Sequence, residues 1–179
     1  MKLLRLLTVF AAFAAFTIRA AADDVTVTLS GVHLCCNNCV KGANAALAPV
    51  TGVKPDINMA AGTIALTAAD TATLQKAVDA LTKGGYFGKS SDASVKVDDS
   101  TGAKAGKVQT LEISGVHLCC GKCVNAVKDA LATVDGAKPD STLVTKAKTF
   151  KVTGNFDAAQ VFAALQKIGL TGKVVVAAN

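Results

Sequence analysis

The sequence of 179 residues is poor in aromatic side chains: it has no tryptophan, one tyrosine and seven phenylalanines. Domains that read single-stranded RNA on a β-sheet stack the bases on aromatic side chains of the central strands. The segments VTVTLS (25–30) and TIALT (63–67) are the candidates for such strands, and neither contains an aromatic residue. The sequence therefore argues against RNA recognition on a sheet surface.

An excess of one charge is also missing. The chain has 19 Lys and Arg against 13 Asp and Glu, a formal net charge of +6. Removal of Lys2, Arg5 and Arg19 with a signal peptide leaves 16 against 13, or +3, too little to argue for a nucleic-acid partner. The chain also lacks a glycine-rich phosphate loop and a cysteine–histidine–carboxylate trio from separate chain positions. We therefore expect no enzyme.

Long apolar runs are confined to the N-terminus, where Leu6 to Ile18 follow the positive Lys2 and Arg5. The small residues before Asp23 suit a cleavage site, so residues 1–22 are predicted to be a secretory signal peptide. The run is short for a membrane span, and an uncleaved anchor is the second interpretation. We expect a periplasmic or secreted protein with no membrane attachment after cleavage.

Cysteine and histidine are absent from most of the chain. All six cysteines and both histidines lie in SGVHLCCNNCV (30–40) and SGVHLCCGKCV (114–124). Export would permit disulfide bonds. Cysteines within five positions of one another close only trivial loops, which remove little entropy from the unfolded chain. Stapling of the fold therefore explains the pattern poorly.

The two clusters belong to a longer internal repeat. Residues 29–56 and 113–140 align without gaps and share 17 of 28 positions. The repeat predicts a first domain at 23–97 and a second at 107–179. Between them, DDSTGAKAG (98–106) has no large apolar residue and is expected to be a flexible linker.

Each half has the pattern strand, helix, strand, strand, helix, strand. Apolar residues alternate in VTVTLS and VQTLEIS, and a last strand of the first half is expected to end at SVKV (94–97). The first helix of each half has an apolar stripe, which consists of Val40, Ala43 and Leu47, and of Val124, Val127 and Leu131. This order predicts an α+β protein of two tandem ferredoxin-like βαββαβ domains with antiparallel sheets.

The cysteines fall where the first strand of each half meets its first helix. Cys36 and Cys39 are three positions apart at the helix start and can point the same way. The partial positive charge of a helix N-terminus favours thiolate, the form that binds soft metals. Cys120 and Cys123 repeat the pair. The remaining candidates are a third sulfur in each half, Cys35 and Cys119, and the nitrogens of His33 and His117, for which packing or hydrogen bonding is the alternative role.

These ligand sets suit several soft metal ions. Two thiolates suit near-linear Cu(I) or Hg(II), and three, with or without a histidine, suit Zn(II), Cd(II) or trigonal Cu(I). Cu(I) and Zn(II) are the leading predictions, with one ion in each half.

The βαββαβ order with C-x-x-C between the first strand and first helix resembles the heavy-metal-associated domain. That family includes copper chaperones, the periplasmic mercury-binding protein and the N-terminal domains of metal-transporting P-type ATPases. The resemblance covers about residues 25–97 and 107–176, and it implies metal binding by the C-x-x-C pairs. Leu34 and Leu118 stand where the family usually has methionine. GGYFG (84–88) resembles a loop near the family's site, but the second copy has Leu170 in place of Tyr86, so the two sites are expected to differ.

We therefore expect an exported metal chaperone or sequestration protein that holds soft metal ions and passes them to a metal-transferring protein partner. One alternative is a thiol-disulfide exchange protein that uses the C-x-x-C pairs. Another is a non-metal interaction module with oxidised cysteines.

Overall fold

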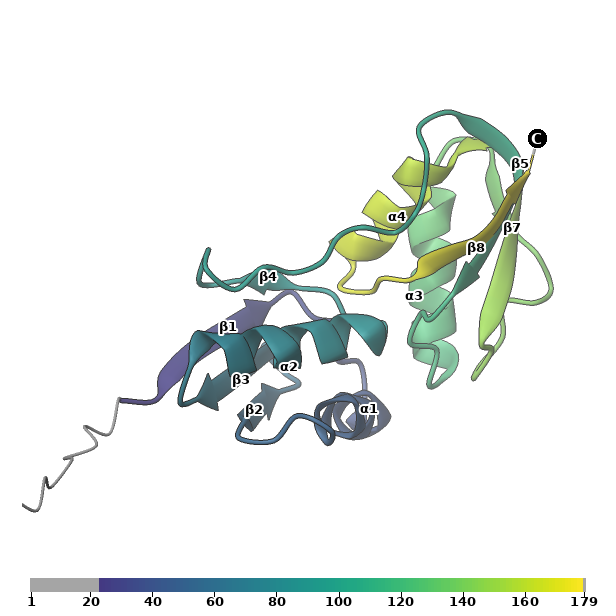
Figure 1. Ribbon diagram of the computed structural model, residues 1–179. Coiled ribbons are helices and arrows are strands. Elements are labelled where there is room, and N and C mark those ends of the chain that lie inside the picture. The colour runs from purple at the N-terminus through teal and green to yellow at the C-terminus, as the bar shows by residue number, and fades with distance from the viewer. Residues whose placement is uncertain (1–22, 179) are drawn as a thin grey trace, which may run out of the picture.

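The computed structural model describes residues 23–178. These residues form two four-stranded antiparallel sheets and four α-helices, as Figure 1 shows. None of the helices in this range has the length and apolar composition that a bilayer crossing needs. The predicted signal peptide, residues 1–22, lies outside the described residues.

The first half follows the predicted order of elements. They are β1 (Val25–Ser30), α1 (Asn37–Leu47), β2 (Lys54–Asn58), β3 (Thr63–Ala68), α2 (Thr71–Lys83) and β4 (Lys89–Ser90). The sheet order is β2-β3-β1-β4, so the first strand lies between the third and the fourth. Val27 and Leu29 of β1 are buried, whereas Thr26 is exposed, which is the alternation that the sequence shows.

The second half repeats the arrangement. Its elements are β5 (Lys107–Ser114), α3 (Gly121–Ala132), β6 (Ala137–Pro139), β7 (Thr149–Asp157), α4 (Ala158–Lys167) and β8 (Lys173–Ala178). Their order in the sheet, β6-β7-β5-β8, is equivalent to that of the first half. Two antiparallel sheets with this strand order are compatible with two ferredoxin-like domains.

The helices bury most of the apolar faces that the sequence predicts, although Val40 of α1 is only partly buried. Val127 and Leu131 of α3 are buried, as are Ala43 and Leu47 of α1. The second helix of each half begins at an aspartate cap. The carboxylate of Asp70 accepts the backbone N–H of Thr73, and that of Asp157 accepts those of Ala159 and Gln160.

The strand predicted to end at 94–97 differs from the structure, and β6 of the second half is short. No strand forms at 94–97; the fourth strand of the first sheet is β4, at Lys89–Ser90. The Gln75 side chain of α2 accepts the backbone N–H of Lys96 and donates to its carbonyl, so side-chain bonds replace strand pairing there. In the second half β6 ends at Pro139, because the Asp140 carboxylate accepts the Thr142 N–H and turns the chain.

The segment predicted as a linker forms no helix or strand, but its first part contacts the second half. The Lys173 ammonium forms an ion pair with Asp98 at 3.0 Å. Thr101 is buried, and its carbonyl accepts the N–H of Val174 at 2.9 Å. These contacts fix residues 98–101 along β8, whereas residues 102–106 are mostly exposed.

Candidate metal centre

The two C-x-x-C pairs lie at the starts of α1 and α3. Cys36 and Cys120 are the N-cap residues, both with extended backbone, and Cys39 and Cys123 lie in the first turns. Cys39 and Cys123 are completely buried, whereas the N-cap cysteines are partly exposed. The prediction that each pair lies at the start of a helix is thus confirmed.

The two halves meet through the loops that precede β4 and β8. The backbone N–H groups of His33 and Phe87 donate to the carbonyl of Gly169, at 3.2 and 3.0 Å, and that of Thr171 donates to Gly85 at 3.0 Å. A Cβ atom at Gly169 would collide with the carbonyl of Gly31 in the first half. A Cβ atom at Gly85 would meet the second half in the same way. Glycine at both positions therefore permits this close approach.

This approach brings the six sulfur atoms of both halves into one group. Within each half, Sγ distances are 3.6 Å for Cys35–Cys39 and Cys119–Cys123, and 3.9 Å for Cys36–Cys39 and Cys120–Cys123. Between the halves, five distances lie between 3.5 and 3.9 Å: Cys35–Cys120, Cys35–Cys123, Cys36–Cys119, Cys36–Cys120 and Cys39–Cys119. A sixth, Cys39–Cys123, is 3.9 Å.

The expectation of one separate thiolate site in each half is therefore corrected. The sulfur–sulfur distances between the halves are as short as those within them, because the starts of α1 and α3 face each other. Cys35 and Cys119, predicted as additional sulfurs, belong to the same group. We call the six atoms the sulfur cluster; a nitrogen of His33 also lies within 4.8 Å of the sulfurs of Cys35 and Cys123.

His117 forms a hydrogen bond where the two halves contact each other, a region that we call the join. The hydroxyl of Tyr86 donates to the carbonyl of Cys39 at 2.7 Å and lies 3.1 Å from Nε2 of His117. The hydroxyl has a single hydrogen, which it donates to the Cys39 carbonyl. In the hydrogen bond between Tyr86 and His117, Nε2–H of His117 must therefore be the donor. A protonated nitrogen has no lone pair for a metal. Nε2 of His117 therefore stabilises the contact between the two halves and does not bind a metal.

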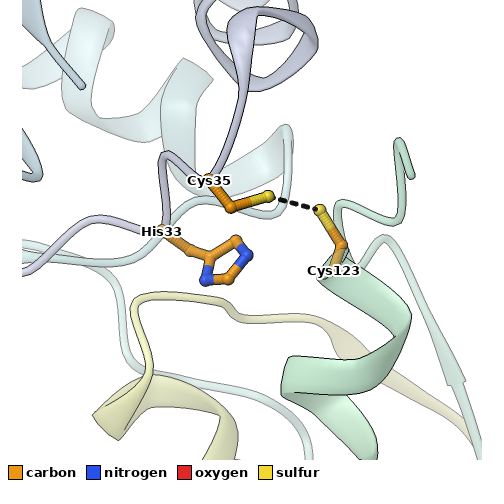
Figure 2. Close-up of side chains that lie close together, drawn as sticks. All are labelled: His33, Cys35 and Cys123. Atoms are coloured by element: carbon orange, nitrogen blue, oxygen red, sulfur yellow. Dashed lines mark hydrogen bonds between the residues drawn. The ribbon is translucent and has the colours of Figure 1, made fainter. Parts of the chain in front are cut away.

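His33 has a different environment because Leu170 replaces the tyrosine. Nε2 of His33 is buried and has no hydrogen-bond partner, and the ring's other nitrogen faces the backbone carbonyl of Ile168. Figure 2 shows the ring beside the sulfur atoms of Cys35 and Cys123. Burial lowers the pKa of His33, which favours the neutral ring. His33 therefore has a free lone pair next to the sulfur cluster.

The thiols of the sulfur cluster have different acidities. The backbone N–H of Cys123 beside the sulfur stabilises the thiolate of Cys120 and lowers its pKa to about 6. Burial acts to raise the pKa of Cys39, but contacts with the Cys119 and Cys35 thiols outweigh it and the pKa is lowered. Burial raises the pKa of Cys35 and of Cys119, and their sulfur neighbours add to the increase. The protein therefore favours thiolate at two of these positions and thiol at the other two.

Sequence reasoning missed the join itself. Gly85, Gly169 and Tyr86 contact the opposite half or its histidine, and Gly42 makes room for Tyr86, because a Cβ there would meet the Tyr86 hydroxyl. The sequence signal was available in GGYFG and IGLTG, which occupy the same place in the two halves. It showed only that the loops correspond, and not that each loop reaches across to the other half.

Comparison with known proteins found no family model, no curated protein and no solved structure that matches this chain. The resemblance to heavy-metal-associated domains therefore depends on the sequence motifs and on the order of the elements.

Proposed function

We propose that this protein binds soft metal ions through the cysteines of both halves acting together, as an exported chaperone or sequestration protein. The proposal takes each half to be a ferredoxin-like domain of the heavy-metal-associated type and residues 1–22 to be a signal peptide. The observation that carries it is the convergence of six sulfur atoms with neighbours 3.5 to 3.9 Å apart. Thiolates are the preferred ligands of Cu(I) and are common ligands of Zn(II).

The surroundings of the sulfurs support a protein that can exchange its metal. Cys35, Cys36, Cys119 and Cys120 are partly exposed, whereas Cys39 and Cys123 are buried. A thiolate of a partner protein can therefore reach four of the sulfurs, while the buried sulfurs of Cys39 and Cys123 remain bound to the ion. This exposure favours transfer to a metal-transferring protein over permanent storage.

The test is metal binding by the reduced chain from residue 23 onward, compared with a variant in which all six cysteines are serine. We expect the wild type to retain Cu(I) or Zn(II) through desalting and to resist alkylation while loaded. The variant should retain none. Circular dichroism of both proteins separates loss of ligands from loss of fold. Equal metal content in the two folded proteins would refute the proposal.

A thiol-disulfide exchange protein is the second candidate, and the low pKa of Cys120 favours it. Reactive cysteines of such proteins have depressed pKa values at helix N-termini. The two functions differ in their products. Exchange activity predicts mixed disulfides with a model substrate and reduction of insulin by the metal-free protein, whereas metal binding predicts neither. Loss of two protons per C-x-x-C pair in protein isolated from its compartment would also favour exchange.

A further inference from the structure

The sulfur cluster has a definite geometry. Ten of its sulfur pairs are separated by 3.5 to 3.9 Å. Two more pairs, Cys35–Cys36 and Cys119–Cys120, lie within 4.8 Å. The three pairs that remain among the six described cysteines are Cys35–Cys119, Cys36–Cys123 and Cys39–Cys120. Each sulfur thus has four neighbours and one opposite atom, which is the connectivity of an octahedron.

The octahedral arrangement of the sulfurs limits how many of them can bind one metal ion. Any four of its corners include at least one opposite pair, so no four sulfurs are mutual neighbours. A tetrahedral site of four thiolates, the usual structural site for Zn(II), therefore cannot form within the sulfur cluster. The sites that do exist are triangular faces of three sulfurs, which suit trigonal Cu(I).

The size of the faces fits a metal–thiolate bond. In an equilateral triangle, the distance from the centre to each corner equals the length of a side divided by the square root of three. Four faces have all three sides between 3.5 and 3.9 Å, which places the centre about 2.0 to 2.3 Å from each sulfur, and a first-row metal–thiolate bond is about 2.3 Å long. Each of the other four faces includes the Cys35–Cys36 or the Cys119–Cys120 side, which lies within 4.8 Å. A copper ion can therefore be held near the plane of a face with little movement of the sulfurs.

We propose, on the basis of the function proposed above, that the six thiolates bind four Cu(I) ions in one cluster. Four alternate faces of an octahedron meet only at corners and use every corner twice, so each thiolate bridges two ions. One such set consists of Cys35–Cys36–Cys120, Cys35–Cys39–Cys123, Cys36–Cys39–Cys119 and Cys119–Cys120–Cys123. The other set consists of the four remaining faces. In both sets every ion has three sulfur ligands.

The charge balance agrees with Cu(I). Loading releases the thiol protons and leaves six negative sulfurs with four single positive charges, a net charge of −2. The N-termini of α1 and α3 both meet the cluster, and each has a partial positive charge equivalent to about half an elementary charge. Four divalent ions would instead give +2 between two positive helix ends. With four ions in the cluster, the charge therefore favours a monovalent soft ion.

The first test is anaerobic titration of the reduced chain from residue 23 onward with a Cu(I)–acetonitrile complex. We expect native mass spectrometry to show four copper ions per chain, and X-ray absorption to show three sulfurs per copper with copper neighbours. Saturation at two coppers with two sulfurs each would overturn the cluster and leave the proposed function intact. No bound copper or zinc would refute the proposed function itself.

Two matched double variants make the geometry falsifiable. Cys35→Ser with Cys119→Ser removes an opposite pair; the four sulfurs left form a square with no triangular face, although both C-x-x-C pairs remain. Cys36→Ser with Cys120→Ser removes neighbouring sulfurs and both C-x-x-C pairs, but it leaves two faces that share the Cys39–Cys123 edge. We expect two-coordinate copper in the first variant and three-coordinate copper in the second. Independent C-x-x-C sites predict unchanged binding in the first and loss in the second, which would overturn the proposal.

Discussion

Cys120 is a partly exposed thiol of the sulfur cluster with a lowered pKa. In the metal-free, reduced protein, its lowered pKa of about 6 makes it a thiolate at neutral pH. Because a thiolate is the reactive form, we predict that iodoacetamide modifies Cys120 before Cys35 and Cys119, which are also partly exposed but have raised pKa values. The rate of this first alkylation should rise with pH through about pH 6 and then level off.

Mass spectrometry of peptides after short pulses of the reagent at several pH values measures that rate for each cysteine. Unfolded protein in urea is the control, because there the six thiols should react at similar rates. First modification at Cys35, or a midpoint near pH 9, would contradict the assignment.

His33 and His117 occupy equivalent positions with different partners, which permits a matched comparison. We predict that His33→Ala makes copper about tenfold easier to remove with a competing chelator, since Nε2 of His33 is free beside Cys35 and Cys123. His117→Ala should instead reduce the free energy of unfolding by about 1 kcal/mol, because it breaks the bond with Tyr86. Chelator competition and urea unfolding of both variants measure the two effects, and equal copper loss from both would contradict a metal-related role of His33.

At the scale of the element, the loops before β4 and β8 hold the halves together by close backbone contact. We predict that Gly169→Ala lowers the thermal midpoint and reduces the copper stoichiometry, because the new Cβ collides with the Gly31 carbonyl of the first half. Gly102→Ala is the control: it has the same φ of +79° but its nearest neighbour is 3.8 Å away.

Both substitutions carry the strain of a left-handed backbone, about 1 to 2 kcal/mol. Only the Gly169 variant should lose copper in addition. Differential scanning calorimetry and native mass spectrometry measure the two quantities. Equal copper content in both variants would show that the join of the halves does not depend on this contact.

The elements also show what the sequence could predict. The apolar stripes depend on residues close together in the chain, so α1 and α3 were located correctly from the stripes that contain Ala43 and Val127. The strand expected at 94–97 was wrong because Gln75, from a separate element, occupies the backbone groups of Lys96. A residue that acts on a distant segment through its side chain leaves no periodic pattern in the sequence.

For the whole molecule, the repeat predicted two similar halves but not their relative placement. The placement depends on carbonyl and N–H groups of Gly85, Gly169 and His33, and backbone groups are the same in every sequence. The identity of the candidate ligands could therefore be read from the chain, whereas their union into one group required the structure. This is why the expectation of two independent sites was wrong although all six sulfurs were identified.

A shared cluster predicts that metal holds the halves together. If a protease site is inserted between Lys104 and Ala105 and then cut, we expect the two fragments to elute as one species while copper is bound. Residues 102–106 are mostly exposed, so the insertion should not disturb either sheet. Chelation under reducing conditions should weaken the association, because it removes the shared metal and leaves the backbone and Tyr86 contacts and the contacts of residues 98–101 with the second half.

Size-exclusion chromatography with light scattering measures the association before and after chelation. The variant with all six cysteines replaced by serine is the control, and its fragments should behave the same with and without copper. Fragments that separate equally in the loaded and the metal-free protein would contradict a cluster shared between the halves.

If four Cu(I) ions fill the octahedral arrangement of the sulfurs as proposed, the ions are divided unequally between the two halves. Exchanging the two halves converts one set of alternate faces into the other, so a filled cluster cannot look the same from both sides. In either set a single ion takes all its ligands from one half, either Cys119, Cys120 and Cys123 or Cys35, Cys36 and Cys39. The other three ions span the join. Separation of the halves would thus strip ligands from three ions at once and leave the fourth behind, fully coordinated, in one half.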